Sequence, residues 1–222
     1  MSQITLPKYD VEELANTMIA LLDGWEDKWV GWIKLFKLLL EGKPVPPDRI
    51  AAFLQRTQEE VKDLIEGAEL DQDGNVVGFG LSIVPTPHSY QIDGRQFYVW
   101  CAGDAITFPL LHKSSAIIES PDPVSGEKIS LTSTPQGVRD VNPASTVVSW
   151  VPGTDSPDNI HSKFCDFTHF FTSEVIASEY VAKHPGLIIV PIEQVFQIGQ
   201  LMWNREPYKS LIAELQTGTD SV

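Results

Sequence analysis

The first part of the chain carries apolar side chains at helical spacing. Val11, Leu14 and Met18 recur every three or four positions, and Asp10 stands before them as a candidate N-cap. A second helix is predicted over residues 26–40, with a buried face formed by Trp29, Trp32, Leu35, Phe36 and Leu39. The pattern therefore predicts two amphipathic helices that pack through one face each.

Proline residues between positions 43 and 47 interrupt this helical pattern, because proline has no amide hydrogen to donate. Two short helices are predicted to follow. One covers residues 48–54, and the other begins at Thr57, whose spacing to Glu60 is that of a capping box. The sequence Asp-Gln-Asp-Gly at residues 71–74 is typical of a turn, and it ends the helical region.

Short runs of β-branched and aromatic residues dominate the chain after residue 75. Strands are predicted over residues 76–84, 89–101 with a turn at Asp93-Gly94, 115–119, 128–133, 146–151, 163–171 and 186–190. Helices are predicted over residues 103–111, 173–183 and 191–204, with Ser173 as an N-cap. The predicted fold class is α+β: a helical, winged-helix-like N-terminal region of residues 1–74, then a strand-rich mixed α+β domain of residues 75–222 that carries the candidate catalytic residues.

The charge of the chain argues against a nucleic-acid partner. The 222 residues have a formal net charge of −14, and the Lys and Arg residues are scattered. Residues 1–80 hold eight basic side chains against fifteen acidic ones. Helices followed by strands are the order of a winged helix, but this charge repels phosphate groups, so we expect no binding to DNA or RNA.

We expect a cytoplasmic protein with no membrane partner. No stretch approaches the roughly 20 apolar residues that span a bilayer, and the start of the chain lacks the basic and apolar regions of a signal peptide. Thiols are kept reduced in the cytoplasm. Cys101 and Cys165, the two cysteines of the chain, are therefore expected to be free thiols and not a disulfide.

Cys101 lies where a predicted strand, ending in Tyr98-Val-Trp, gives way to a helix. A cysteine beside a helix N-terminus can have a lowered pKa, and the thiolate is the form that attacks electrophiles and binds metals. Asp104 follows three residues later, so its carboxylate is placed to exchange a proton with the thiol. The plainer interpretation is that Cys101 is a small buried residue and that Asp104 simply suits the helix dipole.

Cys165 belongs to an aromatic run from Phe164 to Phe171. As a strand, this run places Cys165, Phe167, His169 and Phe171 on one face. Such a face is a wall suited to an organic group carried by a soft metal. Aromatic residues at this spacing are also common in protein cores, and we expect His169 to be a hydrogen-bonded core histidine.

Other catalytic templates do not fit the sequence. No pair among the five histidines has zinc-binding spacing, and the chain has no phosphate-binding loop, Cys-x-x-Cys pair or Gly-x-Ser-x-Gly elbow. Gly78-Phe-Gly80 lacks the third glycine of a dinucleotide-binding loop. The two thiols therefore remain as the candidate reactive groups.

Two segments are similar to the alkylmercury lyase (organomercurial lyase) family: Tyr98-Val-Trp-Cys101-Ala-Gly-Asp104, followed by Phe108-Pro109, and Phe164-Cys165, followed by His169-Phe170-Phe171. The resemblance extends over about residues 75–205. It is looser over the N-terminal helices, which are winged-helix-like in the family. The resemblance implies that Cys101, Cys165 and Asp104 form the mercury site, with the two cysteines as the thiol ligands. It also implies that Asp104 is the proton shuttle of an enzyme that converts R–Hg–X into a hydrocarbon RH and Hg(II).

The resemblance also implies the reaction partners. Organomercury compounds are the substrates, and mercury is both substrate and product, so no cofactor is expected. Small cytosolic thiols are needed to remove Hg(II) for turnover, and a mercuric reductase is an implied acceptor. The chemistry agrees, because mercury is a soft metal that prefers thiolate ligands over carboxylate or imidazole.

Three positions depart from the family pattern. Many members have a cysteine where this chain has Asp166, and another near the position of Asp122. His161 stands roughly where some members carry a basic residue. Because the implied mechanism uses only two thiols, the missing cysteines are compatible with activity.

Two alternatives remain open from the residues alone. The first is a protein that binds or sequesters organomercury compounds or another soft metal without breaking a bond. The second is a relative with an unrelated substrate, in which Cys101 is a covalent nucleophile.

Overall fold

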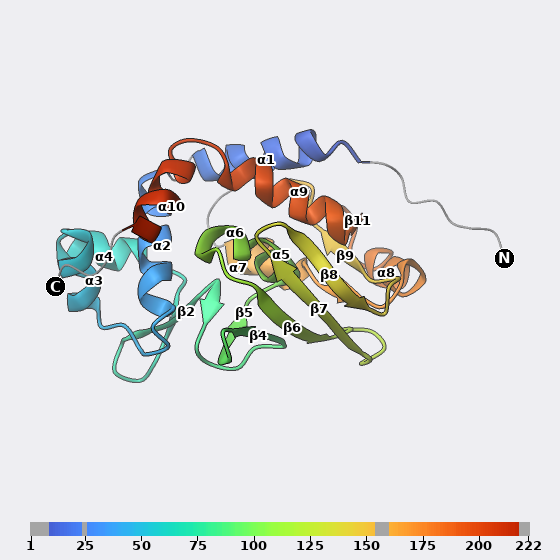
Figure 1. Cartoon of the computed structure of the whole chain (residues 1–222), viewed down its shortest axis with the longest axis horizontal. Coiled ribbons are helices and arrows are strands. Elements are labelled where there is room, and N and C mark those ends of the chain that lie inside the picture. The colour runs from blue at the N-terminus through green and yellow to red at the C-terminus, as the bar shows by residue number, and fades with distance from the viewer. Residues whose placement is uncertain (1–8, 24–25, 154–159, 218–222) are drawn as a thin grey trace.

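The computed structural model describes residues 9–23, 26–153 and 160–217 of the chain (Figure 1). Its helices are α1 (Val11–Asp23), α2 (Glu26–Leu39), α3 (Pro47–Leu54), α4 (Gln58–Leu64), α5 (Ala102–Thr107), α6 (Pro109–His112), α7 (Ile160–Lys163), the 3₁₀ helix η1 (Cys165–Phe167), α8 (Glu174–Val181), α9 (Ile192–Trp203) and α10 (Tyr208–Thr217). Its strands are β1 (Glu69–Leu70), β2 (Val76–Phe79), β3 (Leu81–Ser82), β4 (His88–Ile92), β5 (Arg95–Val99), β6 (Ala116–Pro121), β7 (Lys128–Thr134), β8 (Gly137–Asn142), β9 (Val147–Trp150), β10 (Phe170–Phe171) and β11 (Ile188–Pro191).

Within the described ranges, no helix has both the length and the apolar character that a membrane crossing requires. The first eight residues, which contributed to the expectation that no signal peptide is present, lie outside the described residues.

The capping residues of the N-terminal helices act as predicted. The Asp10 carboxylate accepts hydrogen bonds from the amides of Glu12 and Glu13, at 2.9 and 3.3 Å. The Thr57 hydroxyl accepts from the Glu60 amide, and the Glu60 carboxylate accepts from the Thr57 amide at 2.7 Å. These bonds satisfy amides that the first turn of a helix leaves unpaired, so α1 and α4 begin where the sequence predicts.

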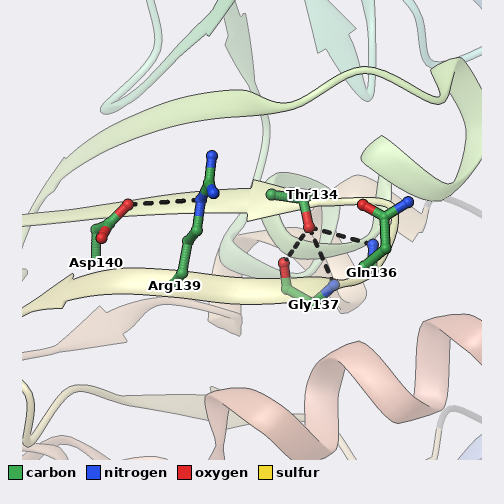
Figure 2. A network of polar contacts seen from close by, with 5 residues as sticks. All are labelled: Thr134, Gln136, Gly137, Arg139 and Asp140. Carbon is green, nitrogen blue, oxygen red and sulfur yellow. Dashed lines mark hydrogen bonds and ion pairs between the residues drawn. The ribbon is translucent and has the colours of Figure 1, made fainter.

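Eight strands form an antiparallel sheet in the order β1-β2-β3-β5-β4-β6-β7-β8. The predicted turn at Asp93-Gly94, with φ values of 48° and 76°, joins β4 to β5. Figure 2 shows the turn between β7 and β8, where the Thr134 hydroxyl accepts from the amides of Gln136 and Gly137 and donates to the Gly137 carbonyl. Strand β8 was not predicted, because it is an edge strand without alternating burial.

Helices cover one face of this large sheet (Figure 1). Helix α5 packs on β4, β5 and β7, and α9 packs over α5. Alternate residues of β4 and β6 are buried, which is the pattern of a sheet with one covered face. A second sheet, in the order β10-β9-β11, lies beside α8 and α9. Helix α5 is therefore enclosed between the large sheet and α9.

The N-terminal helices share the core of the rest of the chain. Helix α1 packs along α9, and α10 packs against α2 (Figure 1). One apolar cluster contains residues from both regions. The α+β architecture is as predicted, whereas the boundary between residues 74 and 75 stays a prediction.

The strand predicted over residues 163–171 is wrong for most of its length. Helix α7 and η1 occupy its first part, and only Phe170 and Phe171 form a strand. The amides of Phe167 and Thr168 donate to carbonyls three residues earlier, at 3.1 Å each, instead of to a neighbouring strand. The predicted alternation of Cys165 with aromatic residues on one strand face is therefore also wrong.

Candidate active site

Cys101 is the N-cap residue of α5, and only Trp100 separates it from the end of β5 at Val99. The amide of Trp100 donates to the Gly80 carbonyl at 2.9 Å, which ties the end of β5 to the turn between β2 and β3. The Cys101 Sγ atom accepts a hydrogen bond from the Asp104 amide at 3.4 Å. The sulfur and the carboxylate of Asp104 thus share the first turn of α5, as their spacing predicted.

A set of hydrogen bonds holds η1, and with it Cys165, against the start of α5. The amide of Ala102, which has no partner inside its own helix, donates to the Thr168 carbonyl at 3.0 Å. The Thr168 hydroxyl donates to the Phe164 carbonyl at 2.8 Å, and the Ser149 hydroxyl donates to the Phe167 carbonyl at 2.6 Å. The irregular segment is therefore fixed by backbone carbonyls at both of its ends.

Cys101, Asp104 and Cys165 come together in space. One oxygen of Asp104 and the two Sγ atoms all lie within 4.8 Å of one another. Both cysteines are free thiols and are buried, with exposed fractions of 0% and 4%. Among the residues that the structure describes, no other group of three His, Cys, Asp or Glu side chains converges in this way.

An apolar cavity of about 80 Å³ reaches the cluster. Its lining residues come from both ends of the chain: Met18, Lys28, Trp29, Trp32, Leu64, Glu66, Phe79, Gly80, Trp100, Gly103, Asp104, Thr107, Phe108, Trp150, Ile160, Phe164, Cys165, Met202 and Trp203. Cys165 and Asp104 line this cavity, whereas Cys101 is fully buried and is not among the lining residues. The sequence placed Trp29 and Trp32 only in a core, because a helical stripe does not distinguish core packing from the wall of a cavity.

Both thiols have raised pKa values. Burial raises the pKa of Cys101 above its ordinary value of 9.0, while a hydrogen bond from Cys165 lowers the pKa by less. The hydrogen bond to Cys101, together with burial, raises the pKa of Cys165 well above the same value. The lowered pKa expected for Cys101 is therefore wrong, because α5 has only six residues and the sulfur is fully buried. Both thiols carry their protons at neutral pH.

Asp104 is the group of the cluster that titrates near neutrality. Burial raises its pKa from 3.8 to about 7, and hydrogen bonds from Cys101 and Trp100 lower the pKa by less. Among the described residues, its Oδ2 atom is buried and has no hydrogen-bond partner. A carboxyl group of this kind is suited to take a proton from one group and deliver it to another at pH 7.

Tyr90 is a neighbour of Asp104 that sequence reasoning missed. It is fully buried on β4, and its hydroxyl lies 2.7 Å from His112 Nε2. Burial raises the pKa of Tyr90 well above 10, and the negative charge of Asp104 raises it further. No sequence signal pointed to Tyr90, because strand β4 and helix α5 meet only in the folded chain.

Comparison with known proteins identifies the family of this chain. A family model described as alkylmercury lyase matches residues 81–204, and one described as the helix-turn-helix domain of alkylmercury lyase matches residues 13–80. The chain belongs to the alkylmercury lyase family. An alkylmercury lyase of Staphylococcus epidermidis is 37% identical over 196 residues, which are 86% of this chain and 90% of the relative. One of Bacillus cereus is 38% identical over 185 residues, or 82% of this chain and 84% of the relative.

A solved structure, the mercury-bound form of MerB2, has the same fold as this chain. Its TM-score is 0.73, its sequence identity is 23%, and the match covers 90% of this chain and 99% of that chain. The family membership confirms the resemblance that the two cysteine segments indicated.

The positions that depart from the family pattern have contacts of their own. Asp122 is buried, and its carboxylate accepts hydrogen bonds from the amides of Thr172, Val124 and Ser125 and from the Thr172 hydroxyl. Burial alone would raise the pKa of Asp122, but these hydrogen bonds lower it. Asp122 therefore joins the turn after β6 to the segment after β10 as an ionised group.

His161, Asp166 and His169 lie beside the cluster and are not members of it. The His161 ring stacks on Trp100 with centroids 4.1 Å apart, and its Nε2 atom lies 3.6 Å from an oxygen of the exposed Asp166 side chain. The Nε2 atom of His169 lies 2.8 Å from the Asp166 carbonyl oxygen. His169 is hydrogen-bonded as expected, but it is half-buried and lies outside a strand.

Proposed function

We propose that Cys101, Asp104 and Cys165 carry out the alkylmercury lyase reaction in this protein, which is the protonolysis of R–Hg–X to RH and Hg(II). The observation that carries the proposal is the convergence of two thiols and one carboxyl group of pKa about 7 within 4.8 Å. Two sulfur ligands suit mercury, and a carboxyl group that titrates near pH 7 suits a proton shuttle. Family membership supports the same reaction.

The reaction begins with capture of the organomercurial by one thiol. Its sulfur forms a bond to mercury, the bond between mercury and X breaks, and the thiol proton leaves with X. We assign this first step to Cys165, because Cys165 lines the cavity and Cys101 does not. The organic group R then lies among the apolar side chains of the cavity.

Asp104 next takes the proton of the Cys101 thiol, and the second sulfur binds mercury. A neutral thiol needs this base, because burial keeps its pKa above 9.0. Electron donation from two thiolates increases the negative charge on the carbon atom. Asp104 then gives the proton to that carbon, the C–Hg bond breaks with its electron pair bonding the proton, and RH leaves. Asp104 is ionised again, and Hg(II) stays on the two sulfurs.

The cavity supports this order of steps. Its walls are mainly apolar, so few water molecules compete with Asp104 for the proton or with sulfur for mercury. Ionised Asp104 and a second thiolate would repel each other at this separation. Passing one proton between them avoids that repulsion, and this is consistent with a carboxyl pKa close to neutrality.

Turnover requires that Hg(II) leave the two sulfurs. We assign this step to small cytosolic thiols, with a mercuric reductase as the acceptor of the metal and the cytoplasm as the place of action. The reaction as written uses no organic cofactor.

The proposal is tested with phenylmercuric acetate and excess dithiothreitol, by gas chromatography of the benzene released. We expect benzene from the wild-type protein and at least a hundredfold less from Cys101→Ser, Cys165→Ser and Asp104→Asn, since a positioned acid–base group contributes roughly 10²–10⁴-fold. Asp166→Asn is the matched control, because it removes an exposed carboxylate beside Cys165 and should retain activity. Stoichiometric binding of phenylmercury without benzene would instead indicate a sequestering protein.

A further inference from the structure

Three tryptophans from distant parts of the chain form one wall of the cavity that reaches Asp104 and Cys165. Trp29 and Trp32 lie on α2, and Trp203 is the last residue of α9. Their ring centroids are 5.0 Å apart for Trp29 and Trp32, 6.1 Å for Trp32 and Trp203, and 6.5 Å for Trp29 and Trp203. These separations are those of directly packed rings, and we call the three residues the tryptophan wall.

Two members of the tryptophan wall are held firmly in place. The Trp32 indole nitrogen donates a hydrogen bond to the Phe79 carbonyl at 2.9 Å, and its ring stacks on Trp203 at an angle of 15°. Both rings are at least nine-tenths buried, with exposed fractions of 7% and 5%. Trp29 is only partly buried and meets both rings edge-on. Trp29 is thus the member of the tryptophan wall with the most exposed surface left for contact with a ligand.

Space beside the sulfur atoms depends on a glycine. A Cβ atom added to Gly103 would lie 3.5 Å from Cys101 Sγ and 3.5 Å from the rings of Phe164 and Trp150. These are ordinary van der Waals contacts, so an alanine at this position fits the fold. The added methyl group would, however, occupy space in the cavity next to the Cys101 sulfur.

We propose that the tryptophan wall makes this protein selective for arylmercury compounds, with Trp29 as a specificity-determining residue supplied by the N-terminal helical region. The inference rests on the proposed lyase activity. All three indole rings line the cavity that also contains Asp104 and Cys165, so an aromatic group on mercury would meet them there. Indole rings attract another aromatic ring through edge and face contacts, which are worth roughly twofold to tenfold in binding for each ring pair beyond simple burial.

The test is a competition between phenylmercury and methylmercury in the presence of excess dithiothreitol, with benzene and methane measured from the same reaction. The ratio of the two kcat/KM values is the readout, because a general loss of folded protein lowers both rates equally. We expect Trp29→Ala to lower the phenyl-to-methyl ratio by roughly fivefold, and Trp29→Phe to keep it within about twofold. Phe53→Ala, which removes an exposed aromatic ring of α3 outside the cavity, should leave the ratio unchanged.

Gly103→Ala provides a second variant, at a glycine that also lines the cavity. We expect it to fold and to slow release of benzene more than release of methane. An unchanged ratio in Trp29→Ala would overturn the proposal, whatever the result for Gly103→Ala. An equal loss for n-butylmercury and phenylmercury in Trp29→Ala would also overturn it, because the wall would then recognise size and not aromatic character. Failure of the wild-type protein to release any hydrocarbon would refute the lyase activity itself.

Discussion

Replacement of Asp104 by asparagine is expected to stabilise the fold at alkaline pH while removing activity. The pKa of Asp104 is about 7 in the folded protein, against an ordinary value of 3.8. Between these pH values the folded state holds one proton more than the unfolded state. The contribution of the Asp104 proton to the free energy of unfolding is therefore fully present below about pH 4. This contribution is lost as pH rises through 7, by about 1.36 kcal/mol per pH unit.

The full linkage energy over roughly three pH units is about 4 kcal/mol. Asp104 is partly exposed to the cavity, so solvent screening reduces this value, and we expect a difference of about 2–4 kcal/mol. The asparagine side chain of the variant carries no charge at any pH. The variant should therefore be more stable than wild type by that amount at pH 8 and nearly equal to it at pH 4. Both thiols and Tyr90 stay protonated in this range, because their pKa values are raised.

The assay is urea denaturation of reduced wild-type and Asp104→Asn protein at pH 5, 6, 7 and 8, with the difference in unfolding free energy plotted against pH. The difference should grow with pH. A flat or falling line would show that the Asp104 carboxylate has an ordinary pKa or a stabilising partner, and it would refute the assignment of Asp104 as a buried shuttle. Asp122→Asn is the matched control. It should lower the free energy of unfolding instead of raising it, because the variant loses hydrogen bonds to an ionised carboxylate.

Three further predictions use other residues of the site. Asp122→Asn should destabilise the protein by about 2–4 kcal/mol at pH 7, with the loss shrinking as pH falls through the lowered pKa of Asp122; urea denaturation at pH 3 to 7 measures it. For wild type, kcat/KM should fall about tenfold per pH unit below a midpoint near 7, because ionised Asp104 is the base; a midpoint near 4 would contradict this. Phenylmercury should add to Cys101→Ser faster than to Cys165→Ser in time-resolved mass spectrometry, and the reverse order would contradict first capture by Cys165.

Much of the fold follows from local patterns in the sequence. Three local features follow from residues close together in the chain, so their physical causes can be read without the fold. They are the N-caps Asp10 and Thr57, the turn at Asp93-Gly94 and the start of α5 at its N-cap Cys101. The spacing of Cys101 and Asp104 is of the same kind, because both lie in one helical turn.

Tertiary structure decided the features that depend on distant residues. The sequence pattern predicted a strand around Cys165, but hydrogen bonds to Ala102 and Ser149 hold a 3₁₀ turn there, and this turn brings together two sulfurs that lie 64 positions apart in the chain. The alternation of aromatic residues shows only where apolar side chains occur. It does not show which groups elsewhere in the chain form hydrogen bonds with the backbone of this segment.

The two cysteines show most clearly what the sequence determines and what only the tertiary structure determines. Sequence alone identified them as the reactive candidates and, through the resemblance, implied what they bind. Only the folded chain shows that burial outweighs the helix dipole, so that the thiols stay neutral and Asp104, not Cys101, titrates near pH 7. The physical reason is that a helix dipole is a local property of the backbone, whereas desolvation depends on every element packed around the site.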